Sequence, residues 1–182
     1  MSNEIRALYS KDTIRVYQAY NKIIASEAVM NGTFGNNFKM DRMTWIKPSF
    51  LWMMYRCGWA TKENQEYVLA IDIQRKAFDY LVANAVISTY QEEMYGSREE
   101  WKRIHSSDIR LQWDPERDIH GNPLNYRSLQ LGLRGEAVRK YVNEWIVDIT
   151  DITSYVNELK CLISQKKDVS MLLPEENIYQ IK

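Results

Sequence analysis

The spacing of apolar residues along the chain predicts short strands mixed with helices. Residues 13–20 alternate as in a strand, with Ile14 and Val16 on one face and Tyr17 on the other. A short run that is apolar on both faces, which is typical of a central strand, follows at 67–73. Further strands are predicted at 108–113 and 129–133, with an edge strand in the tail at 171–181.

Helical periodicity recurs between and after these strands. The cleanest amphipathic stripe runs from Ile152 to Ile163. Other helices are predicted at 21–30, 48–57, 77–85, 98–105 and 135–144. Because strands and helices mix without regular βαβ alternation, we predict one α+β domain over residues 1–182, with a mixed or antiparallel sheet flanked by helices.

The segment at 42–59, RMTWIKPSFLWMMYRCGW, is the most unusual part of the chain. Its residues 50–55 are apolar on every side, which predicts a buried helix that Pro48 opens and Gly58 closes. The residues directly before this helix are polar and cationic. Because the free N–H groups of a helix N-terminus attract anions, we predict a phosphate pocket there.

The overall charge is balanced, with 24 basic and 24 acidic side chains, so any affinity for anions must come from local clusters. No apolar run approaches the roughly 18 residues of a membrane span. Cys57 and Cys161 both lie in apolar helical patterns, and we expect them to be reduced thiols in the core of a cytoplasmic protein.

Two familiar kinds of ligand site have no counterpart in the sequence. His105 and His120 stand alone without a Cys pair nearby, so we predict no metal site. No G-x-x-x-x-G-K motif occurs, and the turn at 132–135 lacks the third glycine of a dinucleotide fingerprint.

A second unusual segment, RLQWDPER at 110–117, combines a strand pattern with acidic residues. Alternation predicts that three apolar side chains face the core together, namely Ile109, Leu111 and Trp113. Gln112 then lies on the other face, Pro115 is predicted to end the strand, and Glu116 emerges behind it.

Glu116 has two interpretations. In one, the strand runs into a solvated acidic turn. In the other, the carboxylate lies beside a site that contains Arg42 and Lys47, where it would stabilise a cationic transition state or bind a sugar hydroxyl.

These side chains together suit cleavage of the N-glycosidic bond of NAD. The leaving nicotinamide is already cationic, so neither a general acid nor a metal is required. The protein has to clamp the pyrophosphate, stack the nicotinamide on a ring and hold a carboxylate against the ribose. The predicted NAD-binding residues are Tyr17, Arg42, Thr44, Trp45, Lys47 and Tyr55, and the predicted catalytic residues are Glu116 and Gln112.

Several strings in the chain resemble one uncharacterised protein family. They are IRVYQAY (14–20), RMTWIKPSFLWMMYR (42–56), QWDPER (112–117) and LQLGLRG (129–135). The resemblance is to the family called domain of unknown function 4291, and it covers nearly the whole chain. It implies no activity, because the family name carries none.

A looser similarity is to ADP-ribosyltransferases of the DNA-modifying toxin type. It rests on a strand with Tyr17, a segment at 47–56 that starts Lys-Pro-Ser-Phe and ends Met-Met-Tyr-Arg, and a later carboxylate. The similarity implies that Ser49 and Tyr55 line the nicotinamide pocket and that Glu116 is catalytic. It also implies transfer of ADP-ribose to an acceptor, which we expect to be DNA, RNA or a protein.

Two other functions fit the same residues. In a nucleic-acid-binding module without catalysis, the cations Arg42, Lys47 and Arg56 would contact phosphates while Trp45 and Trp52 stack bases. The balanced net charge argues against this, because phosphate-driven affinity requires clustered cations. In the third interpretation, the whole Trp- and Met-rich segment is only core and partner surface.

Overall fold

The computed structural model describes residues 1–104 and 106–181, so that His105, the predicted end of one helix, and Lys182 lie outside the described residues. The strands are β1 (Ser2–Asn3), β2 (Arg6–Ala7), β3 (Thr13–Tyr20), β4 (Thr44–Ile46), β5 (Tyr67–Gln74), β6 (Val86–Ile87), β7 (Ile109–Arg117), β8 (Pro123–Leu133), β9 (Ile146–Asp151) and β10 (Asn177–Ile178). The helices are α1 (Lys22–Asn31), α2 (Phe50–Cys57), α3 (Arg75–Ala83), α4 (Glu92–Tyr95), α5 (Arg98–Ile104), α6 (Gly135–Lys140) and α7 (Thr153–Ser164), with a π-helical turn η1 (Tyr141–Trp145) and a 3-10 turn η2 (Ser170–Leu172).

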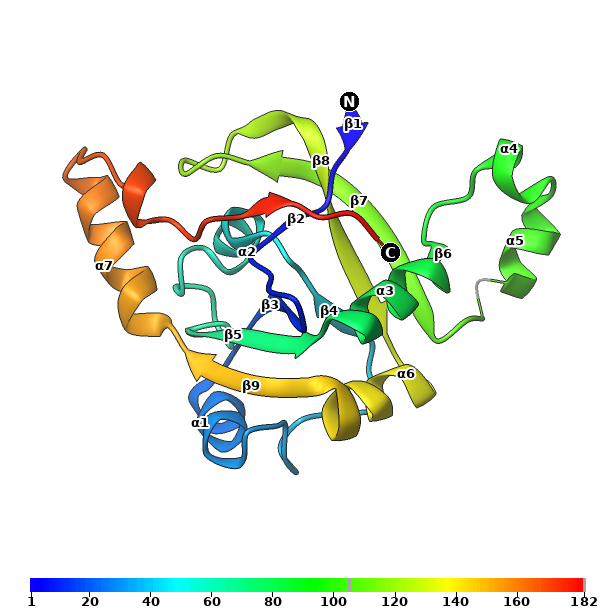
Figure 1. The fold of residues 1–182 in the computed structure, drawn as a ribbon, viewed down its shortest axis with the longest axis horizontal. Coiled ribbons are helices and arrows are strands. Elements are labelled where there is room, and N and C mark those ends of the chain that lie inside the picture. The colour runs from blue at the N-terminus through cyan, green and yellow to red at the C-terminus, as the bar shows by residue number, and fades with distance from the viewer. Residues whose placement is uncertain (105, 182) are drawn as a thin grey trace.

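Two β-sheets form the framework of the molecule (Figure 1). In the five-stranded sheet the order is β1-β8-β7-β6, and β4 also pairs with β8. In the three-stranded antiparallel sheet, β5 lies between β3 and β9. The C-terminal β10 pairs with β2, and a bridge between Tyr17 and Lys47 links β3 to the end of β4. The predicted α+β class is confirmed, and so is the central position of the strand predicted at 67–73.

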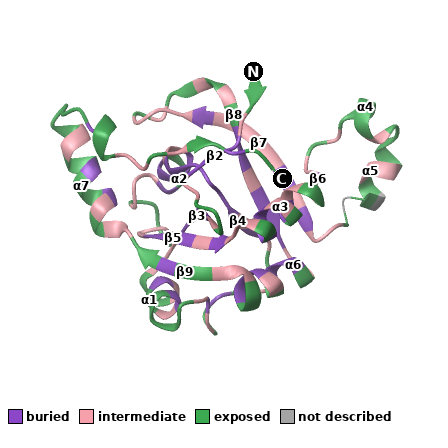
Figure 2. Ribbon diagram, in the orientation of Figure 1, coloured by how far each residue is buried: buried purple, intermediate pink, exposed green. Residues whose placement is uncertain are grey.

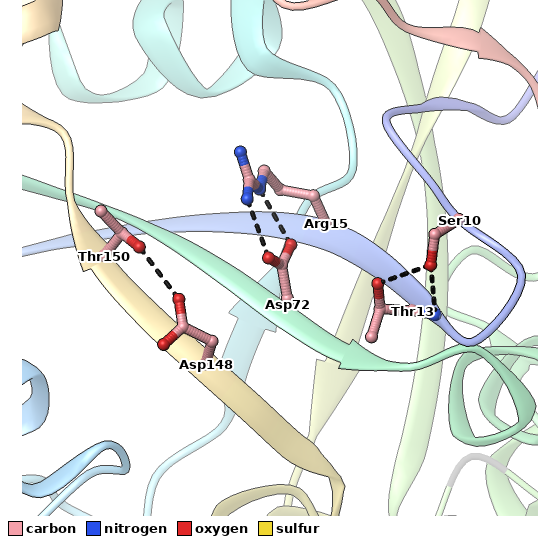
Figure 3. Close-up of polar contacts among 6 residues, drawn as sticks. All are labelled: Ser10, Thr13, Arg15, Asp72, Asp148 and Thr150. Carbon is pink, nitrogen blue, oxygen red and sulfur yellow. Dashed lines mark hydrogen bonds and ion pairs between the residues drawn. The ribbon is translucent and has the colours of Figure 1, made fainter.

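An ion pair joins two strands of the smaller sheet. Arg15 and Asp72 lie directly opposite each other on β3 and β5, and the guanidinium donates hydrogen bonds of 2.9 and 2.8 Å to the carboxylate (Figure 3). On the neighbouring β9, the hydroxyl of Thr150 donates to the carboxylate of Asp148. Arg15 is thus occupied by a partner within the sheet.

Two clusters of buried apolar side chains form the core. The larger one joins both sheets and includes Ile14, Val16, Ile71, Leu111, Leu129 and Leu131. The smaller one joins β3 and β5 to α2 and α7 and includes Tyr17, Phe50, Met53, Met54, Val156 and Leu159. Figure 2 shows buried residues at α2 and along the central strands, whereas α4 and α5 are exposed or only partly covered. The helix predicted to be buried is therefore at the centre of the molecule.

This buried helix, α2, begins later than predicted. It starts at Phe50 and not at Pro48, because the side chain of Ser49 caps it by accepting a hydrogen bond from the backbone N–H of Trp52. Its end is as predicted, since Gly58 has a φ of 61° and can occupy the left-handed conformation that follows a last helical turn.

The strand β7 is longer than predicted. It continues past Pro115 to Arg117 with a bulge between them, and a bulge is a position where a strand tolerates proline. Ile109 and Leu111 are buried as predicted, whereas Trp113 is only partly buried against the core.

Three smaller differences concern the second half of the chain. β8 begins at Pro123 and not at 129, and the helix predicted at 135–144 is divided into α6 and η1. Cys57 is buried, but Cys161 is exposed because it lies on the outer side of α7, so the prediction of two core thiols was wrong for Cys161.

No helix within the described residues is long and apolar enough to cross a membrane.

Candidate functional site

A cavity of about 750 Å³ lies where the end of β3, the segment around β4, α2 and the β7–β8 pair meet. This volume is within the range of about 300–1,000 Å³ that is usual for small-molecule sites. The cavity is lined by polar and cationic side chains, Gln18, Asn21, Asn37, Lys39, Arg42, Thr44, Lys47, Arg56, Glu63, Asn64, Gln65, Gln112 and Gln130, together with Ala19, Tyr20, Ile24, Phe38, Met43, Trp45 and Met53. Four of these side chains are cationic and one is a carboxylate, so the cavity suits an anionic ligand.

Lys47 is the most deeply buried cation of this cavity, with only 5% of its surface exposed. Its ammonium group lies 5.2 Å from the centre of the Trp52 ring, and no described residue forms a hydrogen bond or an ion pair with it. Burial lowers the pKa of Lys47 to about 7, with a further lowering from Arg56 that the charge of Asp114 opposes. An anion placed beside this amine would restore its charge.

Two glutamines from neighbouring strands form another part of the wall. Gln112 on β7 and Gln130 on β8 are directly paired in the sheet. Their Nε2 groups donate hydrogen bonds of 2.9 and 2.6 Å to the two carboxylate oxygens of Asp114. Because three side chains that reach one another must lie on the same face of the sheet, this face presents amide groups to the cavity.

A buried hydrogen-bond network supports the β3 side of the cavity. The hydroxyl of Tyr141 donates to Oε1 of Gln18 at 2.7 Å, and Nε2 of Gln18 donates to the hydroxyl of Tyr20 at 2.8 Å and to the carbonyl of Trp45 at 3.2 Å. Thr44 also hydrogen-bonds Tyr20, whose pKa burial raises above its ordinary value. The amide oxygen and the amide nitrogen of Gln18 both have partners within the protein. The network therefore holds Trp45 in place, and contact with a ligand falls to other lining residues.

The Trp45 ring packs over a glycine. A Cβ atom on Gly132 would lie 3.0 Å from two carbons of the indole and 2.8 Å from the sulfur of Met43. Gly132 and Trp45 are paired across β8 and β4, so the glycine makes room for the ring against the sheet. An aromatic face is thus available on the cavity wall beside the amide groups.

The N-terminus of α2 is occupied by the chain itself. The backbone N–H of Phe50 donates a hydrogen bond of 2.7 Å to Glu176, and the N–H of Trp52 donates to Ser49. The position predicted for an anion is filled by the carboxyl group of Glu176 from the C-terminal segment. The phosphate pocket predicted at these N–H groups is therefore not available in this structure.

Glu116 lies close to this occupied helix end and is only 4% exposed. Burial raises the pKa of its carboxyl, and hydrogen bonds from the N–H of Arg117 and the hydroxyls of Ser49 and Ser128 partly offset the rise. Burial and the nearby Glu116 charge raise the pKa of Glu176 to about 8, although the N–H of Phe50 opposes this. The two carboxyl groups are thus a coupled acidic pair beneath α2.

The predicted site residues fall into two groups. Five of them line the cavity, namely Arg42, Thr44, Trp45, Lys47 and Gln112, although they are distant in the sequence. The other four do not line it, namely Tyr17, Ser49, Tyr55 and Glu116.

Each residue of the second group has a different environment. Tyr17 is 1% exposed in the smaller core cluster, and its hydroxyl has no hydrogen-bond partner in the described part of the chain. Ser49 caps α2. Tyr55 is 43% exposed and stacks under the guanidinium of Arg117, 4.0 Å from the ring centre, near the β7–β8 turn. Glu116 is turned towards Ser49, so the bulge beside it separates it from the cavity wall.

Sequence reasoning missed Gln18, Tyr20 and Gln130. Gln18 carries a recognisable signal, because it continues the face of Ile14 and Val16, and a polar residue on an apolar face requires buried partners. Gln130 carries no such signal, since only the strand register shows that it lies opposite Gln112.

Within residues 1–104 and 106–181, no group of three or more His, Cys, Asp or Glu side chains is arranged to hold a metal ion.

The fold and the site together describe an α+β domain with a cationic, amide-lined cavity at the junction of its two sheets. Comparison with known protein families identifies the family of the chain. A family described as Domain of unknown function (DUF4291) matches residues 4–179, and the chain belongs to this family. The cavity and the acidic pair both lie within the matched residues. No curated protein matches the chain.

Proposed function

We propose that the cavity binds NAD and that the protein transfers ADP-ribose from NAD to a nucleic-acid or protein acceptor. The observation that carries the binding part is the buried amine of Lys47, which has no anionic partner within bonding distance among the described residues. A buried cation without an anion is costly, so a ligand phosphate that supplies the missing charge would be bound favourably.

The other lining residues support a dinucleotide as the ligand. Arg42 and Arg56 add cationic groups beside Lys47 and can hold the second phosphate. Trp45 offers a ring for stacking, and Gln112 and Gln130 offer amides for the polar edge of a base or for ribose hydroxyls.

The transfer part rests on the similarity of the 47–56 segment to ADP-ribosyltransferases. In that reaction the bond between ribose C1′ and the nicotinamide nitrogen breaks, and nicotinamide leaves with the bonding electrons. The acceptor atom then bonds to C1′ and loses its proton. Gln112 lines the cavity and can hydrogen-bond a ribose hydroxyl. The similarity assigns the developing positive charge to Glu116, but this carboxyl is buried beside Ser49 and does not line the cavity, so the proposed transfer relies on the cavity residues.

The transfer is tested by incubating the purified protein with NAD and measuring released nicotinamide, with and without DNA, RNA and protein acceptors. We expect slow release alone and faster release with the correct acceptor. Binding of NAD without release under any of these conditions would contradict the transfer part and leave the binding part intact.

A nucleic-acid-binding module is the second candidate, favoured by the exposed position of Arg42 and Lys39 at the cavity. Salt dependence separates the two candidates. Binding of a nucleic acid through many phosphates falls steeply with salt, whereas capture of one dinucleotide depends on salt only weakly.

A further inference from the structure

We propose that Asp114 orients Gln112 and Gln130 so that the cavity selects ligands with a hydrogen-bond donor on the base, such as the amino group of adenine or the carboxamide of nicotinamide. This inference rests on the proposed nucleotide site and specifies what its polar wall recognises.

The orientation of both amides follows from the chemistry of a carboxylate. Each oxygen of Asp114 is 2.9 or 2.6 Å from the Nε2 atom of one glutamine. An ionised carboxylate only accepts hydrogen bonds, so each amide must turn its NH2 group, and not its carbonyl, towards Asp114. The usual ambiguity between the two ends of a glutamine amide is therefore removed.

Asp114 also lies close to the buried amine of the cavity. One N–H donor from each glutamine points at its oxygens, and its negative charge acts on the ammonium group of Lys47.

The carbonyl oxygens of the two glutamines are then left as acceptors. Neither Oε1 accepts a hydrogen bond from any residue in the described ranges, and both side chains line the cavity. Directly paired residues on neighbouring strands hold their side chains about 5 Å apart, so two acceptors can meet one amino or amide group of a ligand. An oxo group of a ligand in the same place would repel the glutamine carbonyl oxygens, because both groups are hydrogen-bond acceptors.

The Trp45 ring lies next to these acceptors. It packs over Gly132, which is two residues from Gln130 on the same face of β8. A planar base stacked on this ring would present its edge to the glutamines, while its phosphates extend towards Lys47.

The test compares binding of adenosine monophosphate and inosine monophosphate, which differ in an amino and an oxo substituent on the purine. We expect the adenine nucleotide to bind at least about tenfold more tightly, because the oxo group leaves a polar acceptor unpaired. The comparison needs no variant, so it does not depend on how a substitution folds.

Asp114→Asn extends the test. An asparagine has one acceptor and one NH2 group, so it can keep only one glutamine in the original orientation and must turn the other. We expect the preference for the adenine nucleotide to fall to within about threefold in this variant. Asp148→Asn, at an exposed carboxylate bonded to Thr150 on β9, is the matched control and should keep the full preference.

Equal affinity of the two nucleotides for the wild-type protein, or an unchanged preference in a folded Asp114→Asn variant, would overturn the proposed role of Asp114. Absence of binding of these nucleotides and of NAD would instead overturn the proposed nucleotide site itself. The two failures are therefore distinguishable.

Discussion

The carboxyl group of Glu176 accepts a hydrogen bond of 2.7 Å from the backbone N–H of Phe50, so the C-terminal segment supplies an acceptor at the start of the central helix α2. The same carboxyl is close to Glu116, and both are raised in pKa by burial. Two acidic groups therefore lie beside the start of α2, and the charge on one makes ionisation of the other less favourable.

This pair predicts a pH dependence of stability. The pKa of Glu176 rises from 4.5 to about 8 on folding, so between these values the folded state binds the proton more tightly than the unfolded state. Its contribution to the free energy of unfolding is thus fully present below pH 4.5 and is lost as pH rises to about 8. In Glu176→Gln, we expect the difference in Tm between pH 5 and pH 8.5 to shrink by about 2–4 °C.

The control for this measurement is Glu175→Gln, at the exposed neighbouring residue. It should leave the pH dependence of Tm unchanged. If Glu176→Gln also follows the wild-type curve, the acidic pair does not titrate as described.

The buried amine of Lys47 predicts a pH dependence of ligand binding. Its pKa is about 7 in the free protein, and the groups that face it are Trp52, Arg56, Cys57 and Asp114. A bound phosphate favours the ammonium form, so binding above pH 7 requires proton uptake. We expect NAD affinity to fall by up to about tenfold per pH unit above pH 7, measured by titration calorimetry.

Lys39→Met is the matched control for Lys47, because Lys39 is an exposed cation of the same cavity. This variant should weaken NAD binding without changing its pH dependence. An affinity of the wild-type protein that is constant from pH 7 to pH 9 would contradict a role for Lys47 in charge recognition.

The contact of Trp45 with Gly132 predicts a steric effect. In Gly132→Ala the new Cβ would lie 2.8–3.0 Å from Met43 and the indole, so the ring has to move. We expect a destabilisation of about 1–3 kcal/mol and a weaker nucleotide affinity. In a Trp45→Ala background the same change should destabilise less, and thermal unfolding of the four proteins measures this coupling. Equal costs in both backgrounds would show that the ring is not what requires the glycine.

Glu116 tests the transfer step separately from binding. Glu116→Gln keeps the shape of the side chain and removes its charge. Because Glu116 is buried beside Ser49 and does not line the cavity, we expect NAD affinity within about twofold and nicotinamide release within about threefold of wild type. Glu158→Gln, at an exposed position of α7, is the control. Release reduced by about a hundredfold or more in Glu116→Gln would contradict this and would assign the carboxylate to the developing positive charge of the ribose.

Local periodicity was sufficient to predict the helices and strands in which buried residues recur at a regular spacing. The strand at 13–20 has the predicted bounds, and α7 differs by one residue from the predicted stripe. The predicted start of α2 was wrong because the cap hydrogen bond of Ser49 and the acceptor Glu176 depend on tertiary contacts.

The site was harder to predict than the fold. Lys47 was found because it belongs to a polar run directly before an apolar helix, and Gln112 because strand alternation places it on the face opposite the core residues. The structure places both on the cavity wall. Gln130 was missed because strand register is a long-range property. Glu116 was expected near Lys47, but the bulge after Pro115 and the hydroxyl of Ser49 direct it beneath the helix.

The most direct test of the proposed site is calorimetric titration of NAD into the wild-type protein and into Lys47→Met at pH 7. We expect saturable binding to wild type with a Kd below about 1 mM and an affinity at least about tenfold lower for the variant. Because methionine replaces a buried cation that has no anionic partner in the described structure, the variant should remain at least as stable as wild type, so a loss of binding cannot be attributed to unfolding. Absence of binding to wild type at millimolar NAD, or equal affinity of the two proteins, would contradict the assignment of this cavity as the NAD site.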